Sequence, residues 1–274
     1  MLKLMRKFWV IASIATLSVS GMTSCSDDDA PTPDPGTQPD VEEELFPHGR
    51  YLAQGMTDIS FNEDGTVESI KWEELSEPIT FEYYEPENAD TPDVIMNINN
   101  VMYKIFLNDA GFAEKIIEDR GSDKCGLFAI KYNADNQVNY VNYLTGSEDD
   151  RYIEMELDYS NGDIVSTTYT WIESGEISRT TIFKYAYTNS NITSPIDNIG
   201  GLMFFGYCYT PELLQFDFIY LAGFLGKSTK HLPAQMLEEE DMMSFDWKLN
   251  STNLPTICKI TFGDETNSTA ITWL

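Results

Sequence analysis

The stretch Phe61-Asn62-Glu63-Asp64-Gly65-Thr66-Val67-Glu68-Ser69-Ile70 places an aromatic residue before a polar turn and apolar residues after it. Glycine and asparagine tolerate the positive φ angles that short hairpin turns require. The stretch therefore predicts two strands joined by a tight Asn/Asp/Gly turn.

The same pattern recurs along the chain. Copies at matching or shortened spacing lie at residues 107–116, 132–141 and 159–165, and a last strand pair is predicted at 260–262 and 271–273. Repeated hairpins of this kind predict an antiparallel meander.

Strict alternation between residues 151 and 159 supports this fold class. Apolar side chains occupy one face and acidic side chains the other, namely Ile153, Met155 and Leu157 against Glu154, Glu156 and Asp158. Runs of this type number about a dozen or more, too many for a flat sheet. We expect an all-β domain, an antiparallel hairpin meander that forms a soluble barrel-like or strongly curved sheet. Outward-facing acids disfavour a lipid-facing porin wall.

One segment departs from the strand pattern. Thr210 and Pro211 suit a helix start, and apolar residues then fill nearly every position up to Gly226. The sequence predicts a buried helix at 211–225. An amphipathic helix docked on a membrane is the alternative, but the segment lacks a basic face.

The N-terminal residues have the composition of an export signal. Lys3, Arg6 and Lys7 precede an apolar stretch from residue 8 to 19, which is too short to span a membrane. Small residues then lead to Cys25. We predict a signal peptide at 1–24 and lipidation of Cys25, with an ordinary cleaved signal peptide and an incidental cysteine as the alternative.

Residues 25–47 read as a lipidated cysteine followed by an acidic, proline-rich tether with too few apolar groups for a core. Residues 48–274 are predicted to form a single β-rich domain. Proline-rich tethers are extended, by up to ~3 Å per residue, and hold a domain away from its anchor.

Acidic residues dominate the chain, with 45 Asp and Glu against 17 Lys and Arg and a formal net charge of −28. Residues 45–274 hold 37 acids and 14 bases, which gives −23. Such a surface repels nucleic acid, so no nucleic-acid partner is expected. Neutral, cationic or metal-bridged partners suit it, and simple solubility accounts for the charge equally well.

The remaining thiols carry little information. With Cys25 acylated, Cys125, Cys208 and Cys258 are left, so at most one disulfide can form within the chain. Buried free thiols explain the same residues as well.

Motifs for catalysis are not found in the sequence. The two histidines, His48 and His231, are not near a nucleophile motif, and Leu221 stands where a phosphate-binding loop ending in Gly226-Lys227-Ser228 needs glycine. Residues 60–65 resemble a calcium loop only in part and are better read as a hairpin turn. We therefore predict no catalytic residue, no metal site and no cofactor.

Aromatic residues are the remaining indication of function. Four tryptophans, Trp72, Trp171, Trp247 and Trp273, are candidates for stacking on sugar rings if they face solvent, although core packing is the default for each. A non-enzymatic binding module for a glycan or an outer-membrane protein is the favoured interpretation. A glycoside hydrolase that uses an unrecognised carboxylate pair is the alternative.

Three features together resemble a known family. They are the segment Ser26-Asp27-Asp28-Asp29 directly after Cys25, the serial hairpins from about residue 50 to 190, and the stretch Gly223-Phe-Leu-Gly-Lys-Ser-Thr-Lys-His-Leu-Pro233. The chain resembles Bacteroidota surface lipoproteins that carry a domain of unknown function with a porin-like fold. This resemblance implies a lipid-anchored, surface-exposed protein of the outer membrane, for which Ser26 to Asp29 act as the export signal. The resemblance identifies no catalytic residue in this chain.

Overall fold

The computed structural model describes residues 51–52, 56–73, 75–121, 125–144, 151–187, 215–251 and 255–273. These residues belong to one compact unit, residues 46–274, and form seventeen strands and one helix. The strands are β1 (Tyr51–Leu52), β2 (Met56–Phe61), β3 (Val67–Trp72), β4 (Ile79–Tyr83), β5 (Val94–Ile98), β6 (Val101–Leu107), β7 (Ala113–Asp119), β8 (Gly126–Tyr132), β9 (Val138–Leu144), β10 (Tyr152–Ser160), β11 (Asp163–Glu173), β12 (Glu176–Ala186), β13 (Gln235–Glu238), β14 (Asp241–Leu249), β15 (Pro255–Phe262), β16 (Glu265–Ala270) and β17 (Thr272–Trp273); the helix is α3 (Gln215–Leu221).

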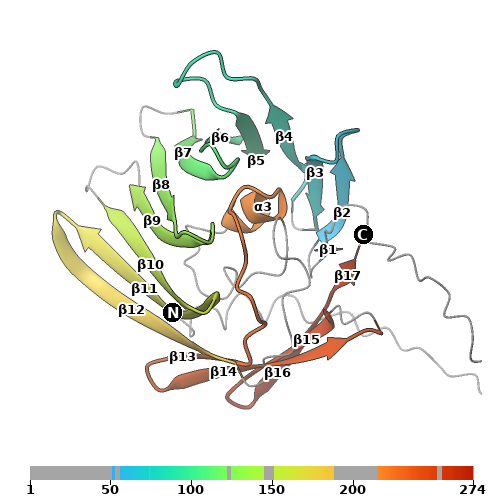
Figure 1. Cartoon of the computed structure of the whole chain (residues 1–274), viewed down its shortest axis with the longest axis vertical. Coiled ribbons are helices and arrows are strands. Elements are labelled where there is room, and N and C mark those ends of the chain that lie inside the picture. The colour runs from blue at the N-terminus through green and yellow to red at the C-terminus, as the bar shows by residue number, and fades with distance from the viewer. Residues whose placement is uncertain are drawn as a thin grey trace, which may run out of the picture. The chain divides into compact units, whose positions relative to one another are not determined.

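Strands β2 to β16 form one fifteen-stranded sheet in which every strand pairs antiparallel with the next one along the chain. The predicted all-β antiparallel meander is thereby confirmed. Figure 1 shows these strands curving around helix α3.

The two ends of this sheet are not paired with each other. Instead, β1 and β17 form a separate two-stranded ladder, in which Tyr51 lies opposite Trp273 and Leu52 opposite Thr272. The sheet is therefore strongly curved but is not a closed barrel.

The predicted turns lie where their sequences place them. Gly65, Gly111, Asn136 and Gly162 have φ angles between 62° and 87° and occupy the β2–β3, β6–β7, β8–β9 and β10–β11 turns. Asparagine side chains also stabilise the β6–β7 and β8–β9 turns. The Asn133 carboxamide oxygen accepts the N–H groups of Asp135 and Gln137, at 2.9 and 3.0 Å. The Asn108 carboxamide oxygen accepts hydrogen bonds from the N–H groups of Ala110 and Phe112, at 2.9 and 3.1 Å. Because alternate turns of a meander lie at the same edge, these four turns share one edge of the sheet, which we call the repeat edge.

Two sequence predictions need correction. The helix predicted at 211–225 is shorter, since α3 ends at Leu221 and residues 222–225 form turns, while 211–214 lie outside the described residues. Gly223, at a φ of 97°, adopts a conformation that favours glycine and ends the helix. None of the described helical segments is long and apolar enough to cross a membrane.

The last predicted strand pair also differs. Strand β15 pairs with β16, so that Phe262 lies opposite Glu265, and residues 272–273 pair with β1 instead. The sequence pattern at 260–273 matched the spacing of the first hairpin, but Gly263 makes a tighter turn at a φ of 56°. The partner of residues 272–273 lies at the other end of the chain, which local spacing does not reveal.

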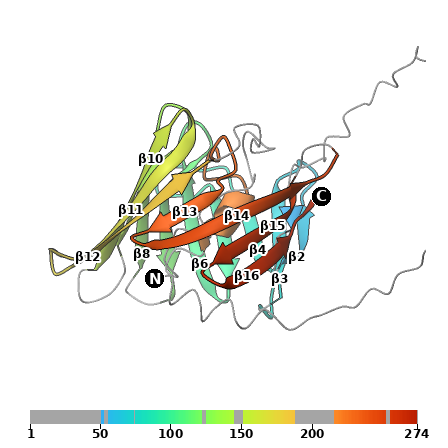
Figure 2. The ribbon, with the colours of Figure 1, turned by 90° about the horizontal axis from the view of Figure 1, so that it is seen from below.

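Aromatic rings fill the space between the sheet and α3. Phe128 on β8 stacks on Tyr143 of β9 with ring centroids 4.1 Å apart, and Phe216 on α3 packs against the same ring at 5.3 Å. Trp72 on β3 meets Phe218 of α3 edge-on at 5.5 Å. Helix α3 therefore packs against β3 and β8, two strands that are not neighbours in the sheet. Figure 2 gives the view at 90° to Figure 1, with β13 to β16 on the side toward the reader.

Replacement of Phe216 by alanine tests this role of α3. Phe216 is fully buried, so Phe216→Ala should lower the free energy of unfolding by about 3–5 kcal/mol, measured by urea denaturation. Tyr84→Ala removes an exposed aromatic ring and is the control, with an expected change within about 0.5 kcal/mol. Equal effects of the two substitutions would show that α3 does not anchor the core.

Candidate functional site

The segment between α3 and β13, residues 222–234, runs along the repeat edge of the sheet. We call it the crossing segment. It meets three hairpins in chain order: the Ala113 N–H donates to the Phe224 carbonyl at 2.8 Å, the Lys227 N–H to the Asn136 carbonyl at 2.8 Å, and the Lys230 N–H to the Gly162 carbonyl at 2.9 Å. The segment thus holds the β6–β7, β8–β9 and β10–β11 turns in a row.

Gly226 makes the closest of these approaches. Its φ angle is 71°, and a Cβ atom at this position would collide with the Asn136 carbonyl oxygen and press on the Tyr132 ring. An isolated bridge between Gln137 and Gly226 continues the contact. Only glycine fits both the backbone conformation and the space.

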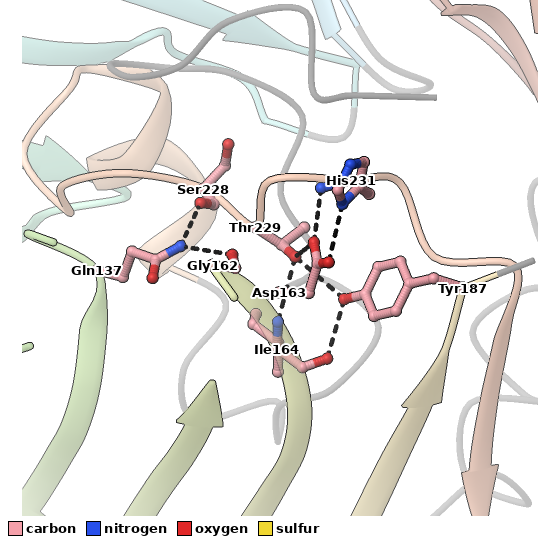
Figure 3. A network of polar contacts seen from close by, with 8 residues as sticks. All are labelled: Gln137, Gly162, Asp163, Ile164, Tyr187, Ser228, Thr229 and His231. Atoms are coloured by element: carbon pink, nitrogen blue, oxygen red, sulfur yellow. Dashed lines mark hydrogen bonds and ion pairs between the residues drawn. The ribbon is translucent and has the colours of Figure 1, made fainter. Parts of the chain in front are cut away.

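The buried Gln137 side chain joins the crossing segment to a second turn (Figure 3). Its amide nitrogen donates to the carbonyls of Gly162 and Ser228, both at 2.8 Å. Its amide oxygen accepts from Asn133 at 3.1 Å. The amide nitrogen thus binds two loops that are distant in sequence, while the amide oxygen is held within its own turn.

Asp163 and His231 lie side by side at the β10–β11 turn. The Asp163 carboxylate lies 2.8 Å from His231 Nδ1 and accepts the His231 backbone N–H at 2.7 Å. The two side chains are only 15 % and 14 % exposed. A carboxylate beside Nδ1 accepts the proton bound there and so orients the imidazole ring.

Thr229, which is fully buried, completes this network. Its hydroxyl accepts the Ile164 N–H at 3.2 Å and lies 3.0 Å from the Tyr187 hydroxyl. Tyr187 in turn donates to the Ile164 carbonyl at 2.9 Å. The backbone at the start of β11 is therefore bound by side chains from the crossing segment and from the end of β12.

A carboxylate and an oriented imidazole are two members of a hydrolytic triad, whose third member is a serine or cysteine nucleophile bound to the imidazole. Within the described residues, no hydroxyl or thiol is hydrogen bonded to His231 Nε2. Figure 3 shows the Ser228 side chain directed away from the His231 ring. Asp163 and His231 instead fasten the crossing segment to the β10–β11 turn.

A second buried carboxylate lies toward the opposite edge of the sheet. Glu118 on β7 accepts hydrogen bonds from the hydroxyls of Tyr103 and Tyr143, at 3.0 and 2.8 Å, and from Arg120 at 2.7 Å. Burial, with the Glu118 charge as the second cause, raises the pKa of Tyr103 and keeps its hydroxyl protonated as a donor. Gly126 lies directly against Glu118, where a Cβ atom would collide.

Glu118 and Asp163 are not a candidate pair for glycoside cleavage. Asp163 begins β11 at the repeat edge, whereas Glu118 lies near the end of β7 at the opposite edge. Within the described residues no three side chains of His, Cys, Asp or Glu are grouped closely enough to hold a metal ion.

Cys125 and Cys258 are both free thiols, so they do not form a disulfide with each other, and Cys208 lies outside the described residues. Burial raises the pKa of the Cys258 thiol to about 12, with Asp246 adding to the effect. Cys258 is consequently a packed thiol without nucleophilic character at neutral pH.

The four tryptophans that were predicted as candidate stacking residues lie on four different strands, and each is half-buried. The indole N–H groups of Trp247 and Trp273 donate to the carbonyls of Pro233 and Pro255, both at 2.8 Å, and these two residues therefore have a structural role. Trp72 packs edge-on against α3.

Trp171 has a different environment. It stacks on the buried Tyr169 at 5.8 Å, and the Arg179 guanidinium covers its ring at 4.9 Å from the centroid. Arg179 also approaches Glu238 at 3.8 Å and remains about half exposed. Of the four tryptophans, Trp171 is therefore the one that packs against a half-exposed arginine, near the tip of the β11–β12 hairpin.

The predicted targeting residues Cys25, Ser26, Asp27, Asp28 and Asp29 lie outside the described residues, so they remain predictions. The Asp163–His231 pair was not predicted from the sequence. The only local indication was the stretch 223–233 itself, which contains a histidine beside small polar residues.

Comparisons with known proteins identify the fold. A family model described as a domain of unknown function (DUF4595) with porin-like fold matches residues 53–258. A porin-like protein from Bacteroides uniformis ATCC 8492 superposes with a TM-score of 0.61 at 14% identity, covering 84% of this chain and 97% of that one. A porin-like protein from Bacteroides vulgatus ATCC 8482 gives 0.55 at 14% identity, covering 79% and 91%. No match was found among curated proteins.

Gly226→Ala tests whether the crossing segment depends on its contact with Asn136. We expect a loss of about 2–4 kcal/mol in the free energy of unfolding, because the added Cβ brings both conformational strain and overpacking. Gly263→Ala is the matched control, since Gly263 also has a positive φ but open space around it, and should cost only about 1–2 kcal/mol. Urea denaturation measures both, and equal losses would contradict the proposed close contact.

Proposed function

Because this chain belongs to the DUF4595 family, domains of unknown function with a porin-like fold, we propose that it is a lipid-anchored outer-membrane protein whose folded domain binds a glycan or a protein partner without catalysing a reaction. The single observation that carries the binding role is the platform made by Trp171 and Arg179 near the tip of the β11–β12 hairpin.

This hairpin extends beyond the core. All five residues from Glu176 to Thr180 are exposed, and Ile177 is 68 % exposed, the largest value among the large apolar side chains of the described residues. Figure 1 shows the tip of the hairpin standing clear of β13. Aromatic and arginine side chains are the types that dominate binding energy at interfaces.

The buried polar clusters support a role without catalysis. Asp163 and His231 bind the crossing segment, and Glu118 binds two buried tyrosine hydroxyls. Each of these titratable groups is used to satisfy buried donors, a structural task that explains its presence.

The membrane attachment that we propose is through the acyl chains on Cys25. The outward-facing side of β10 carries Glu154, Glu156 and Asp158 beside the buried Ile153 and Met155, which suits a domain surrounded by water. The tether at 26–47 would then hold the domain away from the bilayer, and the acidic run at 26–29 would direct it to the cell surface.

Binding is tested with the mature chain on a glycan array and in cross-linking to intact outer-membrane extract. We expect specific signals from the wild type that fall at least tenfold in Trp171→Ala, because truncation removes both the ring and the surface that orients Arg179. Tyr84→Ala, which removes an exposed aromatic ring on another part of the sheet, should leave the signals unchanged. A folded wild type that gives no signal in either assay would refute the binding function.

The anchor is tested in cells by fractionation and external protease. Cys25→Ala should release the protein from membranes, since about 0.8 kcal/mol per buried methylene is lost with the acyl chains. Replacement of Asp27, Asp28 and Asp29 by alanine should leave it membrane-bound but protected from protease. Continued membrane attachment of Cys25→Ala would disprove lipidation at this residue.

A further inference from the structure

Strand β12 has a partner along only part of its second side. It pairs with β11 from Glu176 to Lys184, but the four-residue β13 covers only Phe183 to Ala186. Among the described residues, no strand lies beside residues 176–182 on the β13 side. A stretch of sheet edge is therefore open next to the Trp171–Arg179 platform.

The direction of the backbone groups on this edge follows from its paired end. The Ala186 carbonyl accepts the Ala234 N–H at 2.9 Å, so the groups of Ala186 point toward β13. Because β12 is regular from residue 180 to 186, alternation gives Thr180 and Ile182 the same direction. Their N–H and C=O groups face the open side, while those of Thr181 face β11.

A bulge limits the length of the open edge. The register between β11 and β12 shifts beyond the Trp171–Arg179 pair, where Ile172 lies opposite Ile177 and Ser178 is the additional residue. Bulges end regular pairing and turn an edge away from neighbours. The regular open stretch is thus residues 179–182, which suits a short extended segment and not a long strand.

Acidic side chains surround this edge. Strand β13 ends at Glu238, opposite Phe183, and the turn that follows adds Glu239, Glu240 and Asp241 beside the open stretch. The hairpin itself contributes Glu173 and Glu176. Two of these six acids already have a basic partner, since Arg151 lies 3.4 Å from Glu173 and Arg179 lies 3.8 Å from Glu238. Lys184 is the remaining base on β12, so Glu176, Glu239, Glu240 and Asp241 leave the edge with a net negative charge.

We infer that residues 179–182 of β12 bind an extended cationic segment of a partner protein, which adds to the sheet as an antiparallel strand. The inference rests on the proposed binding function and names its partner class. Backbone hydrogen bonds to Thr180 and Ile182 supply the pairing, and lysine or arginine side chains of the segment face the acidic turn. The exposed Ile177 and Ile182 offer apolar contacts on either side.

A second copy of the chain fits this edge less well. Residues 45–274 carry a net charge of −23, from 14 bases against 37 acids. An antiparallel pair of β12 edges would place the acidic β13–β14 turn of each copy beside the hairpin tip of the other, which carries Glu173 and Glu176. Like charges placed opposite one another across strands are destabilising. Charge complementarity thus favours a cationic partner segment.

The probe is a short fluorescein-labelled peptide of alternating lysine and valine, titrated with the mature chain and followed by fluorescence anisotropy. We expect saturable binding that weakens as salt is raised, and none to the glutamate–valine counterpart. Thr180→Pro should weaken binding about tenfold, because it removes an outward N–H and blocks strand addition. Thr180→Ala keeps the N–H and is the matched control, with unchanged affinity expected.

A second variant is needed because proline at position 180 can also disturb folding. The double substitution Glu239→Gln and Glu240→Gln leaves the backbone intact and should weaken binding about threefold and flatten its salt dependence. Full affinity in both variants, or equal binding of both peptides, would overturn the inference. Sedimentation measures whether the wild type forms a dimer. A dimer that Thr180→Pro abolishes would overturn the inference and show that the edge pairs with a second copy of the chain.

The two proposals fail in distinguishable ways. If the lysine–valine peptide does not bind but Trp171-dependent signals persist on the glycan array or in outer-membrane cross-linking, strand addition is wrong and the binding function stands. If the peptide binds and those signals are missing, the edge is a peptide site and the glycan role is lost.

Discussion

The close approach of Gly226 to the Asn136 carbonyl is the contact around which the repeat edge is organised. A meander pairs each strand only with its neighbours, so hydrogen bonding between strands alone does not decide how strongly the sheet curves. The crossing segment binds three successive turns to one stretch of backbone and so sets their separation. A side chain at position 226 would push this backbone away from the β8–β9 turn, and the contacts of Gln137 and Asp163 further along would be lost with it.

Polar side chains inside this domain, like the crossing segment, hold together parts of the chain that are distant in sequence. Gln137 binds backbone from two parts of the chain, and Thr229 and Asp163 each bind backbone of one distant segment. Glu118 binds two tyrosines and an arginine at the other edge. Buried polar groups are costly without partners, so fully paired networks specify one arrangement among many similar hairpin packings. Side chains available for contact with other molecules therefore lie at the margins, most clearly on the β11–β12 hairpin and the open edge of β12.

The local parts of the fold could be predicted because their causes are local. Gly65, Gly111 and Gly162 adopt the positive φ angles that their turn sequences require, and the alternation from Ile153 to Asp158 matches the buried and exposed faces of β10. The helix was predicted too long because the apolar run continues to Leu225, although Gly223 ends it. Asp163 and His231 are 68 residues apart, and no spacing rule relates them.

The sequence by itself determined the fold class and the positions of the hairpin turns, since periodicity and turn residues act over a few residues. It also predicts a lipid anchor at Cys25, which stays a prediction. Only the tertiary structure decided that the sheet stays open, that residues 272–273 pair with β1, and that Trp247 and Trp273 are held by backbone carbonyls while Trp171 lies under Arg179. It also decided which part of β12 has no neighbouring strand among the described residues, because the length of β13 relative to β12 depends on where the crossing segment joins the sheet. Contacts of this kind join residues far apart in sequence, and local pattern does not specify them.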